Sequence, residues 1–200
     1  YPFGKRKYQI PAGRNIKKAL VLTDIKSIVD YKTKTEAEER ARDLWLFSYL
    51  CNGANVKDIA RLQYRNIDQT MITFVRAKTE RTTKQDQKLI SVVLMPETKQ
   101  IIEKWGVKPA EPQTYVFGLL EKSDNSEKEL AKVRQATKTI NKYMKRIGLD
   151  LGISINLTTY TARHSFATML KRSGAPTEFI SESLGHKDLR TTENYLDSFE

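Results

Sequence analysis

The sequence predicts a mainly α-helical domain of the α+β class with one small antiparallel β-hairpin. Three observations support this prediction. Apolar residues recur at steps of three and four over most of the chain, the step changes to two over residues 71–78 and 89–95, and capping residues mark where the periodic segments begin or end. The 200 residues are 39% hydrophobic and 30% charged, enough to bury a core in one large domain or two small ones.

The first half of the chain contains a basic arm and several helices. Residues 1–20 are basic and poorly patterned, and we expect an arm or linker from an N-terminal DNA-binding domain that this chain lacks. The folded domain should cover residues 21–200. A short helix is expected over about 24–31. A longer one should begin at Thr35, form a capping box with Glu38 and stop before Asn52, and a third should start near Asn55.

A β-hairpin with a long charged tip is predicted next, with strands at 71–78 and 89–95. Pro96 should close the second strand, and a helix is expected over 97–105. A long amphipathic helix should run from Glu127 and end at Gly148. Three further helices are expected over about 160–172, 176–184 and 191–199, whereas residues 109–125 give no clear pattern.

Charge and composition narrow the function classes. The 35 Lys and Arg against 24 Asp and Glu give a formal net charge of +11, which favours a polyanionic partner, nucleic acid before membrane. No apolar run approaches the ~20 residues that cross a bilayer, so we expect no membrane-spanning segment. The single cysteine, Cys51, excludes an intramolecular disulfide framework, and with two histidines it argues against a Cys/His zinc site. We expect a reducing, intracellular setting.

Several residues are hard to explain as structure alone. Arg163 falls on the apolar face of its predicted helix, where the alternatives are an internal ion pair, a guanidinium that reaches solvent, or an anion site. Arg76 and Lys78 share the strand face of Ile72 and Phe74, so either the charged half of the strand protrudes or an anion lies there. His186 lies just past a predicted helix end, where a histidine taken alone is most often a helix cap.

These cations, together with Tyr195, suit metal-independent phosphoryl transfer through a tyrosine ester. Arginine forks and a protonated histidine bind the non-bridging oxygens of a phosphodiester under attack. Positive charge also favours the phenolate as it attacks, and a lysine on a hairpin can protonate the leaving 5′ oxygen. The bond energy stays in the phosphotyrosine, so we expect no cofactor and no metal.

Two segments resemble the tyrosine recombinases, the phage integrase family. Residues 184–195, LGHKDLRTTENY, resemble the box in which LGH precedes TT and a nucleophilic tyrosine. Residues 160–168, YTARHSFAT, resemble a second box, usually a histidine, two residues, an arginine and then H-[ST]-F-A-T. The resemblance implies the tyrosine recombinase catalytic fold and a site-specific recombinase or integrase of a mobile element, acting through a 3′-phosphotyrosine.

The resemblance also implies roles for individual residues. Tyr195 would be the nucleophile, Arg163 the second catalytic arginine, His186 the third-box histidine and Lys78 the hairpin lysine, with His164 structural. Two positions depart from the pattern. Asn55 in the segment GANVKD, residues 53–58, occupies the place of the first arginine, and Tyr160 that of the second-box histidine.

These departures lead to three further expectations. As in similar integrases of conjugative elements and transposons with R-x-K on the strand, we expect Arg76 to replace the missing cation. Tyr160 could donate a hydrogen bond to the phosphate. Asp58 matches an acidic position that supports the site in the family, and we expect Asn55 to cap its helix.

The implied partner is double-stranded DNA, bound by a homotetramer with possible accessory DNA-bending proteins, in the bacterial cytoplasm. A C-terminal docking segment would be absent here, so this fragment should be monomeric off DNA. Two alternatives remain open at this point: a non-enzymatic, helix-turn-helix-like DNA-binding regulator and a DNA-relaxing topoisomerase of type IB-like chemistry.

Overall fold

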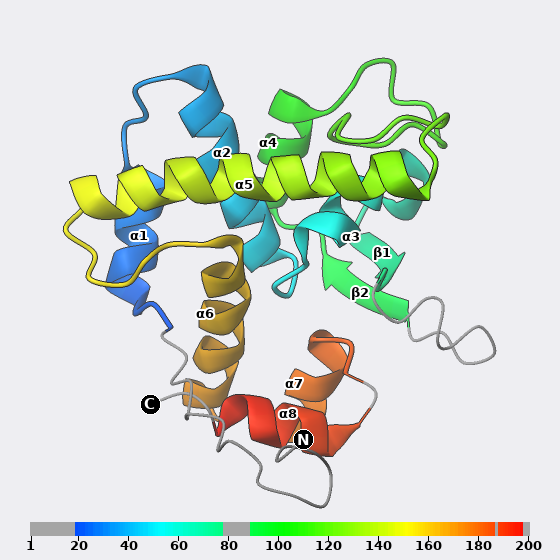
Figure 1. Ribbon diagram of the computed structural model, residues 1–200. Coiled ribbons are helices and arrows are strands. Elements are labelled where there is room, and N and C mark those ends of the chain that lie inside the picture. Colours follow the sequence, from blue (N-terminus) through cyan, green and yellow to red (C-terminus); the bar gives the residue numbers. More distant parts are fainter. Residues whose placement is uncertain (1–18, 78–88, 187, 198–200) are drawn as a thin grey trace, which may run out of the picture.

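The computed structural model describes residues 19–77, 89–186 and 188–197, and within them the predicted fold class is confirmed (Figure 1). The first half contains α1 (Leu22–Asp30), α2 (Glu36–Leu50), α3 (Val56–Arg61), the 3₁₀ turn η1 (Tyr64–Asn66) and the strands β1 (Met71–Val75) and β2 (Leu89–Val93). The second half contains α4 (Pro96–Trp105), α5 (Ser126–Asp150), α6 (Thr159–Arg172), α7 (Thr177–Ser183) and α8 (Leu189–Leu196). Of the predicted arm, residues 1–18 lie outside the described part, as does the hairpin tip.

Helix α2 forms the centre of the main core. Thr35 caps it as predicted, since its hydroxyl oxygen accepts from the backbone N–H of Glu38 at 3.2 Å. The Glu38 carboxylate, however, accepts from the N–H of Lys34 at 2.7 Å rather than that of Thr35. Trp45 and Phe47 of α2 are at most 1% exposed, and α4, α5 and α6 pack around them.

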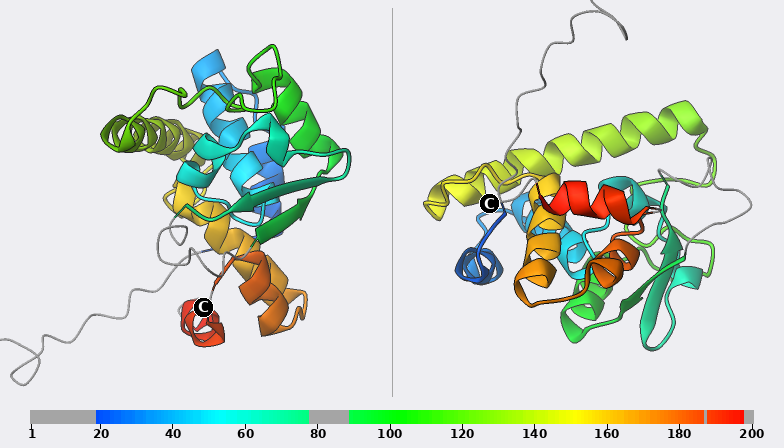
Figure 2. Two further views of the ribbon diagram at one scale, coloured as in Figure 1. Left: turned by 90° about the vertical axis from the view of Figure 1, so that its right-hand side faces the viewer. Right: turned by 90° about the horizontal axis from the view of Figure 1, so that it is seen from below.

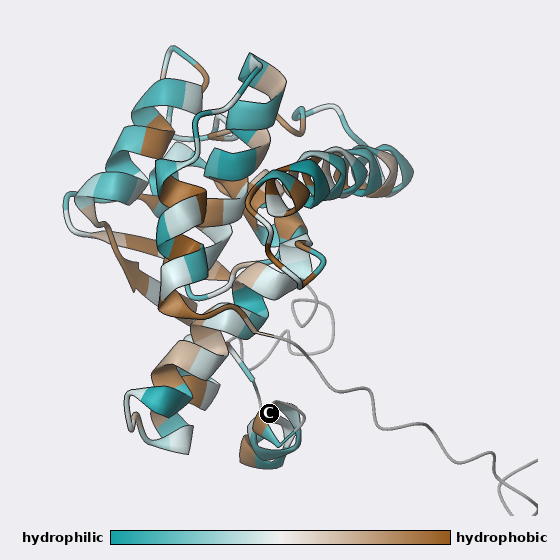
Figure 3. Ribbon diagram, turned by 90° about the vertical axis from the view of Figure 1, so that its left-hand side faces the viewer, coloured by the Kyte–Doolittle hydropathy of each residue, from teal (hydrophilic) through white to brown (hydrophobic). Residues whose placement is uncertain are grey.

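The long helix α5 crosses the molecule beside α2 and has one apolar side (Figure 1). Ile140, Met144 and Ile147 are buried, whereas most of the helix is hydrophilic, as its teal colour shows in Figure 3. The prediction that Gly148 ends this helix is wrong, because α5 continues to Asp150. Gly148 lies inside the helix, where a Cβ would meet Leu157 Cγ at 3.0 Å, so this glycine serves close packing rather than termination.

The two strands form a two-stranded antiparallel sheet in which Met71 pairs with Val93 and Val75 with Leu89. Ile72 and Phe74 of β1 face the core, as the alternation predicted. Pro96 does not close β2, which ends at Val93; it is instead the first residue of α4, where its fixed φ suits a helix start.

The unassigned segment 109–125 forms turns that cover α2. Phe117 is 1% exposed and packs edge-on against Phe47, with the ring centroids 4.8 Å apart. Tyr115 forms an isolated antiparallel bridge with Gln63. This segment is therefore anchored by buried aromatic contacts rather than by regular structure.

Helix α6 packs against α2, and α7 and α8 lie beside the far end of α6 (Figures 1 and 2). A second, small apolar cluster joins them, built from Ala167, Ile180, Leu184 and Leu196. Helix α8 begins at Leu189 behind an Asp188 cap and ends at Leu196, somewhat before the predicted range. The Nζ of Lys171 donates to the carbonyl of Leu196 at 3.1 Å and links α6 to the end of α8.

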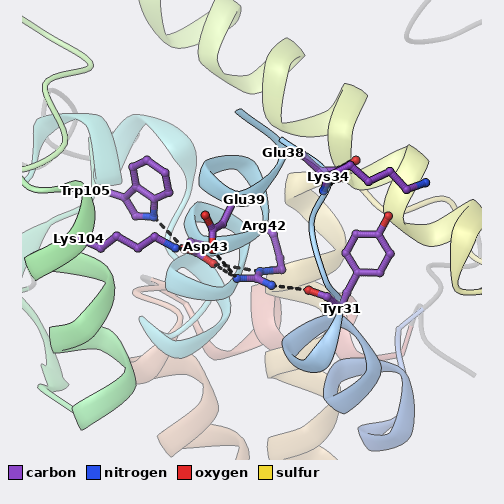
Figure 4. Close-up of polar contacts among 8 residues, drawn as sticks. All are labelled: Tyr31, Lys34, Glu38, Glu39, Arg42, Asp43, Lys104 and Trp105. Carbon is purple, nitrogen blue, oxygen red and sulfur yellow. Dashed lines mark hydrogen bonds and ion pairs between the residues drawn. The ribbon is translucent and has the colours of Figure 1, made fainter. Parts of the chain in front are cut away.

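A buried carboxylate ties α1, α2 and α4 together (Figure 4). Asp43 on α2 accepts from Trp105 Nε1 at 2.8 Å and from Lys104 Nζ at 3.1 Å, both on α4. Arg42 donates to Asp43 and, at 2.5 Å, to the carbonyl of Tyr31 after α1. Every charge in this network has a partner, as burial requires. Among the residues that the structure describes, no helix is long and apolar enough to cross a membrane.

Candidate active site

Arg163 lies on α6 with its guanidinium turned into the protein. The residue is 5% exposed, which confirms the burial expected from its place on the apolar face. Its NH1 donates to the carbonyl of Gly53 at 2.9 Å and its NH2 to that of Leu184 at 2.7 Å. The side chain therefore joins the turn before α3 to the end of α7.

Arg76 follows β1 on the same face as Ile72 and Phe74, and it too is buried, at 9% exposed. Its NH1 donates to the carbonyl of Leu184 at 3.0 Å and to that of Gly185 at 3.3 Å. The Leu184 oxygen thus accepts from both arginines and brings their guanidinium groups side by side. The prediction that Arg76 shares the buried strand face of Ile72 and Phe74 is confirmed.

The proximity of the two arginines is costly in the absence of an anion. Burial, and then the nearby charge of Arg76, lower the pKa of Arg163 to about 10. Both effects disfavour the charged guanidinium. A phosphate beside the pair would relieve the repulsion and replace the lost hydration, so the electrostatics of this place favour an anionic ligand.

A tight turn after α7 places the carbonyls and the histidine. The N–H of Gly185 donates to Glu182 O and that of His186 to Ser181 O, each at 2.9 Å, which is the Schellman pattern. Gly185 has φ +63°, and a Cβ on it would lie 2.7 Å from Arg76 Cδ. Only glycine therefore fits both the backbone conformation and the close approach of Arg76.

His186 lies between the arginines and the candidate nucleophile. Its Nε2 is 3.4 Å from Arg163 NH2, and its Nδ1 is 2.8 Å from the hydroxyl of Thr192, a fully buried residue of α8. The His186 ring meets that of Tyr195 edge-on, with centroids 5.7 Å apart. Thr192 thus orients the imidazole toward the arginine pair.

Tyr195 is half-buried on α8, in the same site as both arginines. Burial raises the pKa of its phenol, although the nearby charges of Arg163 and Arg76 act in the opposite direction. The hydroxyl lies 2.5 Å from Nδ1 of His164, on α6. The phenol is therefore protonated at neutral pH in this arrangement and is hydrogen-bonded to an imidazole.

Asp58 supports Arg76 through the backbone. It is 5% exposed, and its Oδ1 accepts from the N–H of Ala77 at 2.8 Å, the residue that follows Arg76. Its Oδ2 accepts from the N–H and the side-chain amide of Asn55 at 3.3 and 3.4 Å. Asn55 precedes the first residue of α3 as the expected cap, and its amide is directed to Asp58.

The two remaining predicted site residues are Tyr160 and Lys78. Tyr160 is 59% exposed at the start of α6, and its ring centroid is 5.4 Å from that of His164. Lys78 lies outside the described residues. The structure thus brings together Arg76, Arg163, His186 and Tyr195, with Asp58 behind them and Tyr160 at the edge.

Sequence reasoning missed several contributors to the site. The resemblance implied a structural role for His164, yet its ring contacts the Tyr195 hydroxyl. Thr192 orients His186, and a Cβ on Gly53 would lie 2.7 Å from Arg163 Cα, but no role in the site was predicted for either residue. His164 does follow Arg163 directly in the chain, but nothing local to α6 indicates that α8 docks against it.

The arrangement suits an attack by a phenol on a phosphodiester. Two guanidinium groups and an imidazole lie side by side, and donors of this kind can stabilise the charge that develops on a phosphate in the transition state. Within residues 19–77, 89–186 and 188–197, His, Cys, Asp and Glu side chains form no group of three or more that could hold a metal ion.

Comparison with known proteins places these observations in a family. The sequence matches the Phage integrase family over residues 18–200. Tyrosine recombinase XerD of Staphylococcus epidermidis is 46% identical over 54 residues, 27% of this chain and 18% of that protein. XerD of Oceanobacillus iheyensis is 44% identical over 54 residues, which are again 27% of this chain and 18% of that protein.

Solved structures share the fold at low sequence identity. XerA recombinase has a TM-score of 0.59 at 20% identity over 94% of this chain and 60% of its own. A Tn1549 transposon integrase in complex with a circular intermediate DNA has a TM-score of 0.63 at 14% identity, and the match covers 95% of this chain and 63% of that one. XerH bound to palindromic difH substrate has a TM-score of 0.65 at 18% identity, and the match covers 96% of this chain and 54% of that one. The chain therefore spans less than two thirds of these proteins. Since the family match covers nearly the whole sequence, the chain belongs to the Phage integrase family.

Proposed function

We propose that this chain is the catalytic part of a site-specific DNA recombinase that cleaves and rejoins strands through a 3′-phosphotyrosine. One observation carries the proposal: Arg76, Arg163, His186 and Tyr195 meet in one site although they come from four separate segments. Family membership supports the same reading.

The chemistry assigned to the site is a transesterification. The Tyr195 oxygen attacks the scissile phosphorus, the bond from phosphorus to the 5′ oxygen breaks, and a phosphotyrosine forms. Arg76 and Arg163 bind the non-bridging oxygens, and His186 donates a further hydrogen bond. Lys78, assigned from the sequence pattern and the resemblance, protonates the leaving 5′ oxygen. Rejoining reverses each step without ATP, because the ester retains the bond energy.

We further propose that the reaction integrates or excises a mobile element. Support comes from the Tn1549 transposon integrase, a structural neighbour solved with circular intermediate DNA. Complete exchange cuts both strands of each of two duplexes, four strands in all, so the proposed working unit on double-stranded DNA is a homotetramer. Light scattering on the complex with DNA measures this directly, and a complex that never exceeds two chains would contradict it.

The deciding experiment uses nicked duplexes that trap the covalent intermediate. We expect the wild-type chain to form an adduct that resists denaturation on nicked duplexes taken from the ends of the proposed mobile element. Tyr195→Phe should bind the same duplexes equally well and form no adduct. Phenylalanine keeps the ring between the two histidines, so the variant changes only the hydroxyl. Equal DNA binding without cleavage by the wild type would favour a regulator. Relaxation of supercoiled plasmid without exchange between two sites would favour a topoisomerase.

A further inference from the structure

His164 lies where a proton acceptor for the nucleophile is needed. Its Nδ1 is 2.5 Å from the Tyr195 hydroxyl, and the two ring centroids are 5.5 Å apart. We propose that His164 is a catalytic residue, the general base that removes the Tyr195 proton during cleavage and returns it during rejoining. The inference rests on the recombinase function proposed above.

The position of His164 is well defined. The residue is 8% exposed on α6, next to Arg163, so its ring is packed rather than free to turn in solvent. The Tyr160 ring contacts it at 5.4 Å between centroids. For the phenol to donate to Nδ1, that nitrogen must carry no proton, so the neutral imidazole holds its proton on Nε2.

The other groups around the phenol are poorer acceptors. Arg163 and Arg76 are cations and have no lone pair to offer. The two ring nitrogens of His186 are directed to Arg163 and to Thr192, and its ring meets Tyr195 edge-on. The oxygens of Asp58 accept from the backbone N–H of Asn55, just before α3, and from that of Ala77, after β1.

A base is also required by the state of the phenol. Burial raises the pKa of Tyr195, so the attacking group is a neutral hydroxyl rather than a preformed phenolate. A neutral phenol is a weak nucleophile, and transfer of its proton to a base in hydrogen-bond contact accelerates the attack. Among the described contacts of this hydroxyl, the one to His164 supplies such a base.

The proposed step balances as follows. The Tyr195 O–H bond breaks, its proton passes to His164 Nδ1, and the phenol oxygen bonds to phosphorus. The bond from phosphorus to the 5′ oxygen breaks, and this oxygen takes a proton from the separate acid assigned to Lys78. In rejoining, the 5′ hydroxyl gives its proton back to that acid and attacks phosphorus, and the imidazolium returns its proton to the departing tyrosine oxygen.

Two substitutions separate proton transfer from mere hydrogen bonding. In His164→Asn the side chain can accept a hydrogen bond near the position of Nδ1 but cannot hold a proton at neutral pH, whereas His164→Phe keeps a ring without an acceptor. We expect both variants to bind a nicked duplex within about twofold of wild type. Both should form the covalent adduct about 100-fold to 10,000-fold more slowly, the usual effect of losing a general base.

Substitution of reaction partners then assigns the role. Replacing Tyr195 by 3,5-difluorotyrosine, whose phenol ionises more readily, should restore adduct formation by His164→Asn at least about tenfold. A 5′-bridging phosphorothioate substrate, whose leaving group needs no proton, should not restore it.

The opposite outcomes overturn the inference. Adduct formation by His164→Asn at the wild-type rate would reduce His164 to a positioning residue. Slow cleavage without rescue by difluorotyrosine would mean that His164 has only a structural role. Rescue by the phosphorothioate would mean that His164 acts on the leaving 5′ oxygen instead of on Tyr195. Absence of any adduct from the wild-type chain would refute the recombinase proposal and this inference with it, which distinguishes the two failures.

Discussion

The substitution Gly185→Ala tests whether the turn after α7 positions Arg76. At φ +63° an alanine costs about 1–2 kcal/mol in backbone strain alone. The new Cβ would also lie 2.7 Å from both Arg76 Cδ and Ile90 Cδ1, so these side chains must retreat by roughly 1 Å to reach ordinary contact. Such overpacking adds about 1–3 kcal/mol. We therefore expect the free energy of unfolding to fall by about 3 kcal/mol.

A matched control isolates the steric part of this effect. Gly174 ends α6 in the same hydrogen-bond pattern at φ +79°, but a Cβ there would meet nothing within 4 Å. Gly174→Ala should therefore cost only the strain, about 1 kcal/mol by chemical denaturation. Because a 1 Å displacement of a phosphate-binding group costs about 100-fold in rate, Gly185→Ala should also slow adduct formation to that extent while Gly174→Ala does not. Equal stability and equal cleavage rates for the two variants would refute the reasoning.

Three other predictions concern Arg76, Asp58 and Glu129. Arg76→Ala should slow adduct formation about 100-fold to 1,000-fold, whereas Asn55→Ala, which alters a helix cap, should cost about 1 kcal/mol of stability and little activity. The reverse ranking in a cleavage assay would remove Arg76 from its proposed role. Asp58→Asn should slow cleavage without abolishing DNA binding, because it weakens the bond that fixes the backbone beside Arg76; an unchanged rate would show that this bond is dispensable. Burial raises the pKa of Glu129, but bonds from Arg61 and Lys57 outweigh it, and the net pKa is lowered. This carboxylate thus stabilises the α3–α5 contact above its unfolded pKa of about 4.3, and the stabilisation is lost as the pH falls further. Glu129→Gln should lower stability at pH 7 by about 1 kcal/mol and flatten the acid limb of a denaturation series; an unaltered acid limb would contradict this.

Local pattern predicted most of the elements. Helix periodicity, the Thr35 cap and the glycines at 174 and 185 located the helices to within a few residues, because these signals act over one or two turns of chain. Gly148 shows where local reading fails. A glycine after an amphipathic run resembles a stop, yet here packing against Leu157 outweighs its helix propensity, and α5 continues.

The site, too, contains residues that the sequence could identify and residues whose roles it could not. Arg163 and Arg76 could be found from the sequence, because a cation at a position whose neighbours require burial conflicts with the local pattern. His164 and Thr192 lie within the two boxes that resemble the family, but their contacts could not be predicted from the sequence. Their importance arises from contacts with Tyr195 and His186, and these depend on how two helices dock.

The sequence by itself determined the fold class, the approximate positions of the helices and strands, and the side-chain types on which the proposed phosphoryl transfer rests. Only the tertiary structure decided that the carbonyl of Leu184 would receive both Arg76 and Arg163, and that the Tyr195 hydroxyl would meet His164 rather than solvent. The physical reason is range. Capping and periodicity are set by neighbours along the chain, whereas the site is set by the packing of α6, α7 and α8 around a small apolar cluster.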